Sequence, residues 1–374
     1  MKNRFIKSLL GIVISLSMIL TFTSNFTLAA TQSEYMEMRN FVRSTLAHNH
    51  VRGSVVVVKN GQPQQISYGY GWYGKKLGNG NEKVVYPVGS LQKIITGAMI
   101  VQLINEKNGT DQEFSQYTKI SRWYPNLKNA DEISVGNLLT HTSGIMAKGT
   151  EINRGYVYSE DNAVNWLINH INASTMKPVG TYFYNNANFI LLAGIIAKIT
   201  GQSYEANLQT RIIDKLGLTH TYLYQNIPSS MTDAISYNWN GYHNYQNPAY
   251  VKASLASQIP GAGNLFSTPM DYYHIMVGLT DGSILSADDF HYLTHIASTR
   301  TGYSGGMYLK NNDSLKTVYG NLGGTHFGNW VQLTTDNQNG LIMFLNQTTD
   351  SEAANKAVGY QILNHIKANT FIAN

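Results

Sequence analysis

Strand-like patterns lie near both ends of this chain, and the patterns between them are mainly helical. Val51 to Val58 is a β-branched run, Asn60-Gly61 is a two-residue turn signal, and Gln65 to Tyr70 alternates, so together they predict a hairpin at the border of a sheet. Strand-like runs return late in the chain, at Gly306–Leu309, Trp330–Thr334 and Leu341–Leu345. The two ends of the chain are therefore expected to meet in one sheet, with a helical insertion beside it.

The longest apolar helical pattern is Leu91 to Asn105, which carries few charges and is therefore expected to be largely buried. Further helices are expected at Val135–Thr140, Ala163–Ile171, Phe189–Ile199, Ser203–Leu216, Met270–Leu279 and Ser351–Ala368. We therefore expect one α+β domain over residues 30–374, with an α/β lobe from about residues 30–95 and 260–374 and a helical lobe from about residues 96–259.

The first residues differ from the rest of the chain. Lys2, Arg4 and Lys7 precede the apolar run Leu9 to Phe22, and Thr27-Leu28-Ala29-Ala30 offers small residues for cleavage. This pattern predicts a signal peptide over residues 1–29, and hence a protein secreted to the extracellular face of the membrane or to the cell wall. The competing interpretation is an uncleaved anchor, but the run is shorter than the roughly 20 apolar residues of a spanning helix.

Composition removes several classes of function. The chain has no cysteine, so disulfides and thiolate metal sites are excluded. No two of the 11 histidines have a ligand spacing such as His-Glu-x-x-His, and we expect neither a metal nor another cofactor. Three positive charges of the net +5 precede the apolar run, and Lys and Arg are not clustered, so nucleic acid is not an expected partner.

Ser90-Leu91-Gln92-Lys93 lies at the beginning of the apolar helix. Spacing of i, i+3 places the hydroxyl and the amine on one helical face, and a partly desolvated lysine can take the proton of a serine nucleophile. The helix N-terminus disfavours a protonated amine and favours an anion at Ser90. Alone, this spacing is common by chance, and Ser90 could merely cap the helix while Lys93 is exposed.

Tyr184-Asn185-Asn186 precedes the apolar helix that starts near Phe189. A tyrosine at a loop-to-helix junction can pass a proton to a leaving group if a nearby cation holds down its pKa, and an Asn amide can orient lysine and substrate. The alternative is an ordinary packed tyrosine, one of 25 in the chain, beside an N-cap asparagine.

Taken in order, these motifs resemble the serine β-lactamase and penicillin-binding-protein superfamily, in its class C and D-alanyl-D-alanine-carboxypeptidase-like branch. The resemblance extends from about Val51 to the C-terminus. Besides the two motifs above, it rests on the segments Leu138-Leu139-Thr140-His141-Thr142-Ser143-Gly144-Ile145, Lys215-Leu216-Gly217-Leu218 and Gly261-Ala262-Gly263-Asn264-Leu265-Phe266-Ser267-Thr268-Pro269-Met270-Asp271.

The resemblance implies an antiparallel sheet with flanking helices, an all-helical subdomain and a site in the cleft between them. It further implies that Ser90 forms an acyl-enzyme, that Lys93 is the general base and that Tyr184 shuttles the proton to the leaving group. Asn186 would brace Lys93 and the substrate. His141 is expected to be structural, because a histidine base needs a positioned nucleophile.

The third motif of this superfamily, Lys-Thr-Gly or His-x-Gly, has its best match in Gly320-Asn321-Leu322-Gly323-Gly324, where Asn321 replaces the cation and Leu322 the hydroxyl. The N–H groups of Gly324 and Ser90 would form the oxyanion hole, with Gly323 allowing close approach of the backbone. What is lost is the clamp on a substrate carboxylate, unless His326 or an arginine such as Arg300 replaces it.

This departure favours an ester without a carboxylate beside the reacting carbonyl. The leading hypothesis is a secreted esterase that removes D-alanyl groups from teichoic acid, acts as a monomer and can be acylated by β-lactams. The alternatives are a D,D-carboxypeptidase acting on peptidoglycan stem peptides, a weak β-lactamase, or a non-catalytic protein that binds or senses the wall. A lipase-like esterase is disfavoured, since Ser90 lacks the Gly-x-Ser-x-Gly pattern.

Overall fold

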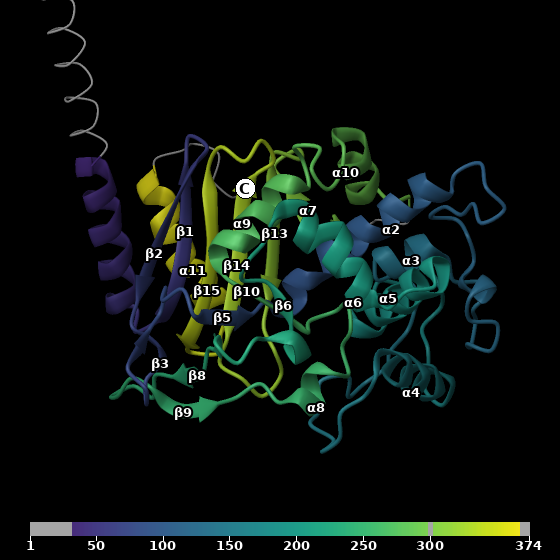
Figure 1. The fold of residues 1–374 in the computed structure, drawn as a ribbon, viewed down its shortest axis with the longest axis horizontal. Coiled ribbons are helices and arrows are strands. Elements are labelled where there is room, and N and C mark those ends of the chain that lie inside the picture. Colours follow the sequence, from purple (N-terminus) through teal and green to yellow (C-terminus); the bar gives the residue numbers. More distant parts are fainter. Residues whose placement is uncertain (1–31, 298–301, 367–374) are drawn as a thin grey trace, which may run out of the picture.

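The computed structural model describes residues 32–297 and 302–366. The predicted signal peptide, residues 1–29, lies outside the described residues. A helix over residues 32–48 precedes the first strand and lies along one end of the molecule (Figure 1).

One mostly antiparallel sheet joins the two ends of the chain, as predicted. Strand β1 (Arg52–Lys59) pairs with β2 (Gln62–Tyr68) on one side and with β15 (Gly340–Thr348) on the other. Asn60-Gly61 forms the turn with φ of 52° and 73°, the positive values expected of a two-residue hairpin, and β2 lies at the sheet edge. Beyond β15 follow β14 (Gly328–Thr334), β13 (Leu315–Gly320), β12 (Met307–Lys310) and β11 (Tyr303–Ser304), and β8 (Ser236–Asn238) and β9 (Gln246–Ala249) extend the sheet from β15.

Helices cover both faces of this sheet, which explains the unbroken β-branched run of β1. Val55 and Val57 enter a hydrophobic core shared with the helix of residues 32–48 and with α11 (Glu352–Ile366). Val56 and Val58 enter a second core on the other face, shared with α9 (Pro269–Gly278). Successive side chains of a strand point to opposite faces, so a strand buried on both faces reads as continuously apolar.

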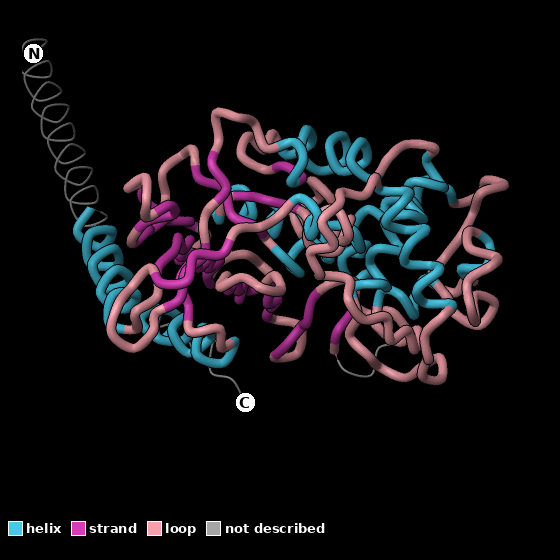
Figure 2. Tube along the Cα trace, turned by 90° about the horizontal axis from the view of Figure 1, so that it is seen from below, coloured by secondary structure: helices cyan, strands magenta, loops and turns pink. Residues whose placement is uncertain are grey.

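The remaining helices gather mainly at the end of the molecule opposite the sheet (Figures 1 and 2). They are the 3₁₀ turn η1 (Gly89–Gln92), α2 (Lys93–Lys107), η2 (Ile120–Arg122), α3 (Val135–Leu139), α4 (Glu160–Asn172), α5 (Asn186–Thr200), α6 (Tyr204–Leu208), the π-helical η3 (Gln209–Ile213), α7 (Asp214–Leu216), η4 (Tyr224–Asn226), α8 (Ala253–Ala256) and α10 (Ala287–Thr294). The predicted helix Ser203–Leu216 is therefore present, with a π-helical segment in its middle.

The stretch expected to be mainly helical also contains short strands, within residues 222–249. Strands β8 and β9 join the large sheet, and the others pair in a smaller one. They were not predicted because strands of two to four residues are too short to show a periodicity in sequence. The smaller sheets are β6 (Tyr222–Leu223), β10 (Leu265–Ser267), β5 (Val84–Pro87) and β7 (Thr232–Asp233), and β3 (Tyr70–Trp72) with β4 (Leu77–Gly78).

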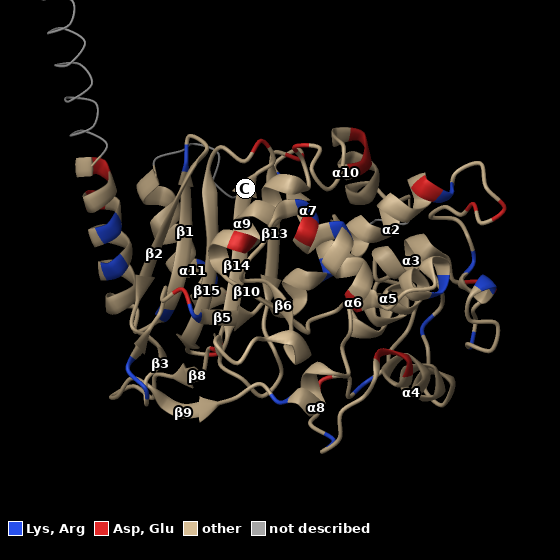
Figure 3. Ribbon diagram, viewed as in Figure 1, with Lys and Arg blue, Asp and Glu red and all other residues tan. Residues whose placement is uncertain are grey.

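Charged residues are sparse in the strands of the sheet and lie mainly in helices and loops (Figure 3). Within residues 32–297 and 302–366, no helix combines the length and the apolar character needed to cross a bilayer.

Candidate active site

Ser90 and Lys93 lie together where η1 continues into α2. Lys93 Nζ is 2.8 Å from Ser90 Oγ and donates a hydrogen bond to the carbonyl oxygen of Ala262 (3.0 Å). The Lys93 side chain is fully buried, whereas Ser90 is partly exposed. Burial and the bond to Ala262 therefore fix the amine next to the hydroxyl. The alternative of an exposed lysine is wrong.

Burial lowers the pKa of Lys93 to about 7, although the field of Glu151 opposes this shift. Near neutral pH a large fraction of Lys93 is therefore a neutral amine, which can accept the Ser90 proton while an N–H still donates to Ala262. This is the protonation state that a general base requires.

Gln92, between the two motif residues, fixes the segment that carries Ala262. Its side chain donates to Asn264 Oδ1 (3.0 Å) and accepts from the Leu265 backbone N–H (3.0 Å). Thr96 donates to the Gly261 carbonyl (2.7 Å) from the next turn of the helix. The segment Gly261-Ala262-Gly263, which had no role assigned from its sequence, therefore supplies the backbone carbonyl that accepts from the Lys93 amine.

Gly89 allows the nucleophile turn to pack against the end of β13. It has φ of 57°, and a Cβ there would lie 2.6 Å from the Asn321 carbonyl oxygen. Gly89→Ala is therefore expected to lower the free energy of unfolding by about 2–3 kcal/mol and to reduce turnover, because Ser90 must shift.

Urea unfolding checks this effect, and Gly109→Ala is the matched control. Gly109 has a similar φ of 73° but open space at its Cβ position, so only the backbone cost of about 1 kcal/mol applies there. Equal destabilisation by the two substitutions would contradict a specific contact at Gly89.

Tyr184 faces the same hydroxyl from the loop before α5. Its side chain hydrogen-bonds to Ser90, and its ring centroid is 5.2 Å from Lys93 Nζ. Part of the ring is exposed, yet burial around the hydroxyl raises the Tyr184 pKa well above its ordinary value. The sequence hypothesis required a cation that holds this pKa down, but the pKa of Tyr184 is raised despite the neighbouring lysine. Tyr184 is thus a phenol, suited to donate a proton.

His141 packs against Tyr184 with ring centroids 4.2 Å apart. Its Nδ1 lies 2.8 Å from Asn188 Nδ2 and accepts from the Asn185 backbone N–H (3.3 Å). Burial and the neighbouring Lys93 hold the His141 pKa well below its usual range, so the ring is neutral. These contacts favour the structural role that was expected.

Asn186 lies at the first position of α5 but is oriented differently from the expectation. Its Nδ2 donates to Glu151 Oε1 (2.5 Å), while the polar partner that braces Lys93 is the Ala262 carbonyl. Asn185 is the N-cap, accepting from the Ala187 N–H (2.9 Å). Glu151 was not identified from sequence, because it lies in a loop with no motif of its own.

The third motif begins where β13 ends. Asn321 is exposed and lines the cleft beside Ser90, whereas Leu322 is only 3% exposed and packs into the hydrophobic core. A Cβ at Gly320 would lie 3.0 Å from the Ser90 nitrogen, so the strand end lies directly against the nucleophile turn.

Gly323 and Gly324 follow in a turn after the strand. Gly323 N–H donates to Glu151 Oε2 (2.7 Å), and Gly324 has φ of 71°, a conformation that favours glycine. The pairing of the Gly324 and Ser90 N–H groups as an oxyanion hole stays a prediction.

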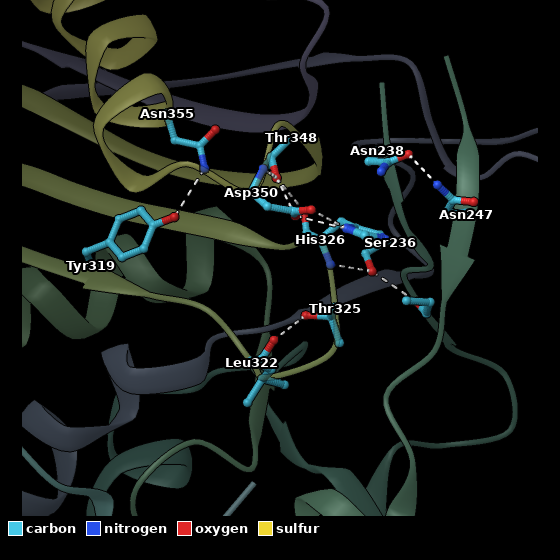
Figure 4. A network of polar contacts seen from close by, with 11 residues as sticks. Ser236, Asn238, Asn247, Tyr319, Leu322, Thr325, His326, Thr348, Asp350 and Asn355 are labelled. Atoms are coloured by element: carbon cyan, nitrogen blue, oxygen red, sulfur yellow. Dashed lines mark hydrogen bonds and ion pairs between the residues drawn. The ribbon is translucent and has the colours of Figure 1, made fainter. Parts of the chain in front are cut away.

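Of the two residues considered as substitutes for the missing clamp, His326 is engaged elsewhere. His326 Nδ1 lies 2.8 Å from an Asp350 carboxylate oxygen, and its backbone N–H donates to Ser236 (3.0 Å), which holds it in the network of Figure 4. In the same network Thr325 donates to the Leu322 carbonyl (2.7 Å) and closes the turn. Arg300 lies outside the described residues.

The cleft at Ser90 has a volume of about 420 Å³ and is rich in tyrosine. Its lining residues are Ser90, Tyr182, Tyr184, Tyr303, Tyr308, Lys310, Thr317, Val318, Tyr319, Asn321, Glu352 and Lys356. A larger cavity, of about 850 Å³, lies between the helix of residues 32–48 and the edge strand β2, but it is lined by no serine–lysine pair. We therefore assign the chemistry to the smaller cleft.

Comparison with known proteins agrees with this geometry. Residues 38–363 match the family described as Beta-lactamase. The chain is 25% identical over 343 residues to the teichoic acid D-alanine hydrolase of Staphylococcus aureus, covering 89% of this chain and 79% of that protein.

Two solved structures share the fold. FmtA from Staphylococcus aureus has a TM-score of 0.71 and 24% identity, with 86% of this chain and 85% of that chain covered. D-amino acid amidase from Ochrobactrum anthropi SV3, complexed with L-phenylalanine amide, has a TM-score of 0.72 and 18% identity, with 88% and 99% covered. The chain belongs to the beta-lactamase family and is a serine hydrolase, which confirms the superfamily and fold expected from the motifs.

Proposed function

We propose that this member of the beta-lactamase family hydrolyses D-alanyl esters on a teichoic-acid-like polymer of the cell envelope. The reaction would pass through an acyl-enzyme on Ser90, outside the cytoplasmic membrane. The alignment with a teichoic acid D-alanine hydrolase over 89% of the chain supports the class of acyl group. The predicted signal peptide and the polymer substrate of that relative support the location.

The site residues support two proton transfers. The neutral Lys93 amine takes the proton of Ser90 Oγ as the oxygen attacks the ester carbonyl. The ester C–O bond then breaks, and the alcohol oxygen receives a proton through Tyr184, which is resupplied by the ammonium of Lys93. Water repeats the sequence on the acyl-enzyme and releases free D-alanine.

The observation that carries the choice of an ester is the composition of the third motif. Asn321, at the cleft, is neutral, and Leu322 is buried in the core and offers no hydroxyl. A peptide that ends in D-Ala-D-Ala, or a β-lactam, presents a carboxylate beside the reacting carbonyl, and neither side chain can neutralise it. An ester of D-alanine with a polyol phosphate has no carboxylate at that position.

One observation favours a second candidate, a D,D-carboxypeptidase or weak β-lactamase. Lys310, on β12, lines the cleft together with Ser90 and could attract a substrate carboxylate. Lys356 also lines the cleft, but it is paired with Glu352 (2.5 Å).

Release of free D-alanine separates the two candidates. The purified protein is incubated with D-alanylated teichoic acid and, separately, with a D-Ala-D-Ala pentapeptide, and free D-alanine is measured over time. We expect release from the polymer and at least about 10-fold slower release from the peptide, because the unclamped carboxylate loses a charge-assisted hydrogen bond. Release from the peptide alone would overturn the ester proposal in favour of the carboxypeptidase.

A further inference from the structure

We propose that Glu151 selects acyl groups that carry a protonated amine on the carbon next to the reacting carbonyl. The site would then take aminoacyl esters in preference to simple acyl esters of the same shape. This inference rests on the proposed function and deepens it, because it names the group by which the acyl part is recognised.

The carboxylate of Glu151 bridges the start of α5 and the turn that follows β13. Oε1 accepts from the Asn186 side chain at the start of α5 (2.5 Å), and Oε2 accepts from the Gly323 backbone N–H after β13 (2.7 Å). Its field acts on both reacting groups, since it raises the pKa of Lys93 and that of Tyr184. Glu151 therefore lies close to the bond that Ser90 would attack.

The loop that carries Glu151 is tied to its surroundings on both sides. The Ala147 carbonyl accepts from the Asn185 side chain (2.7 Å), and the Ile152 carbonyl accepts from the Gln258 side chain. These bonds reach the α5 helix and the segment before Gly261. The carboxylate is thus placed by the fold, as a recognition group must be.

Glu151 has hydrogen-bond donors but no cation as its partner among residues 32–297 and 302–366. Arg154, in the same loop, donates to the Gly149 carbonyl (3.0 Å) and lies over the Trp166 ring. Lys93 is buried against Ser90 and Ala262. A charged carboxylate with amide donors only leaves lone pairs for a further donor, and an ammonium satisfies both its charge and its hydrogen bonding.

The chemistry of the substrate matches this arrangement. In an aminoacyl ester the ammonium is attached to the carbon that adjoins the carbonyl, so an acyl group directed toward Asn186 and Gly323 would bring its ammonium to Glu151. A substrate carboxylate at the same position would be repelled. At Asn321 the site lacks the cation that would attract a substrate carboxylate. Glu151 instead provides a carboxylate that would attract a substrate amine.

The test compares two esters of the same alcohol, D-alanyl and propionyl, which differ by the amine. At pH 6.5, where the α-amine is largely protonated, we expect the wild-type protein to prefer the D-alanyl ester in kcat/KM by about 10- to 100-fold, the value of one charged hydrogen bond. Glu151→Gln should remove most of this preference. Its effect on Lys93 acts on both esters alike and cancels in the ratio.

Two readouts distinguish recognition from a structural role. The preference of the wild-type protein should fall as pH rises through the pKa of the substrate amine, and this fall should be absent in Glu151→Gln. Glu352→Gln is the matched control, because Glu352 lines the cleft but is already paired with Lys356, and it should leave the ratio within about 3-fold.

Equal hydrolysis of the two esters by the wild-type protein would overturn the role of Glu151 while leaving the esterase function intact. A Glu151→Gln protein that keeps the wild-type preference for the D-alanyl ester would also overturn it, since another group would then recognise the amine. Absence of hydrolysis of either ester and of teichoic acid would mean that the proposed function is wrong, and this assignment with it.

Discussion

Ser90→Ala is expected to lower kcat/KM for D-alanine release by at least about 10⁴-fold, because within residues 32–297 and 302–366 Ser90 carries the one hydroxyl that the Lys93 amine hydrogen-bonds. Lys93 Nζ keeps its bond to the Ala262 carbonyl in this variant, so the free energy of unfolding should change by only about 1 kcal/mol. Mass spectrometry after brief exposure to substrate should show a D-alanyl adduct on the wild-type protein and none on the variant.

Ser286→Ala is the matched control for this substitution. Ser286 is the N-cap of α10 and accepts from the Asp289 N–H (3.1 Å), away from the cleft. Its loss should cost about 1 kcal/mol of stability and leave turnover unchanged. Retained activity in Ser90→Ala, or an adduct that survives there, would show that another residue is the nucleophile.

Much of the fold follows from patterns of local sequence. The β-branched run at Val51 to Val58 predicted strand β1, and Asn60-Gly61 predicted the turn that follows it, because both signals act over a few residues. Strand β13 was not predicted. Lys316 interrupts its apolar pattern, yet this lysine is fully buried, with its amine donating to the Met276 carbonyl (3.0 Å).

The candidate site was predictable where its residues share a motif. Ser90 and Lys93 are three residues apart on one helical face, so their contact follows from local geometry. Ala262 and Glu151 could not be predicted, because they reach the site through loops closed by distant hydrogen bonds such as that from Asn185 to Ala147. For the same reason the sequence predicted Lys93, and not Glu151, as the side chain that Asn186 contacts.

Lys93→Met is expected to lower kcat/KM by about 10³- to 10⁴-fold, since the proton of Ser90 loses its acceptor. In the wild-type protein, kcat/KM should rise with pH on the acid side with an apparent pKa near 7, the value to which burial lowers the pKa of Lys93. Rates of D-alanine release by the wild-type and variant proteins, measured over a range of pH, give both the loss of kcat/KM and the apparent pKa.

The same substitution should make the protein more stable at neutral pH. The pKa of Lys93 is 10.5 when unfolded and about 7 when folded, so between these values the unfolded state binds more protons and wild-type stability rises with pH. At pH 7 this difference in proton binding by Lys93 lowers the free energy of unfolding by about 4 kcal/mol. Methionine removes that cost but leaves the Ala262 carbonyl unpaired, at about 1–3 kcal/mol, so we expect a net gain of about 1–3 kcal/mol.

Urea unfolding at pH 7 and pH 9 checks the sign, because the gain from Lys93→Met must shrink as the wild-type lysine becomes neutral in both states. Lys316→Met is the matched control: burial lowers the pKa of Lys316 to about 7 as well, but its amine contacts Met276 and Asn337 and not Ser90. It should show the same dependence of stability on pH with activity retained. A Lys93→Met protein that is less stable than wild type at pH 7 would mean that the buried amine is held charged by its surroundings, and a charged amine could not be the base for Ser90.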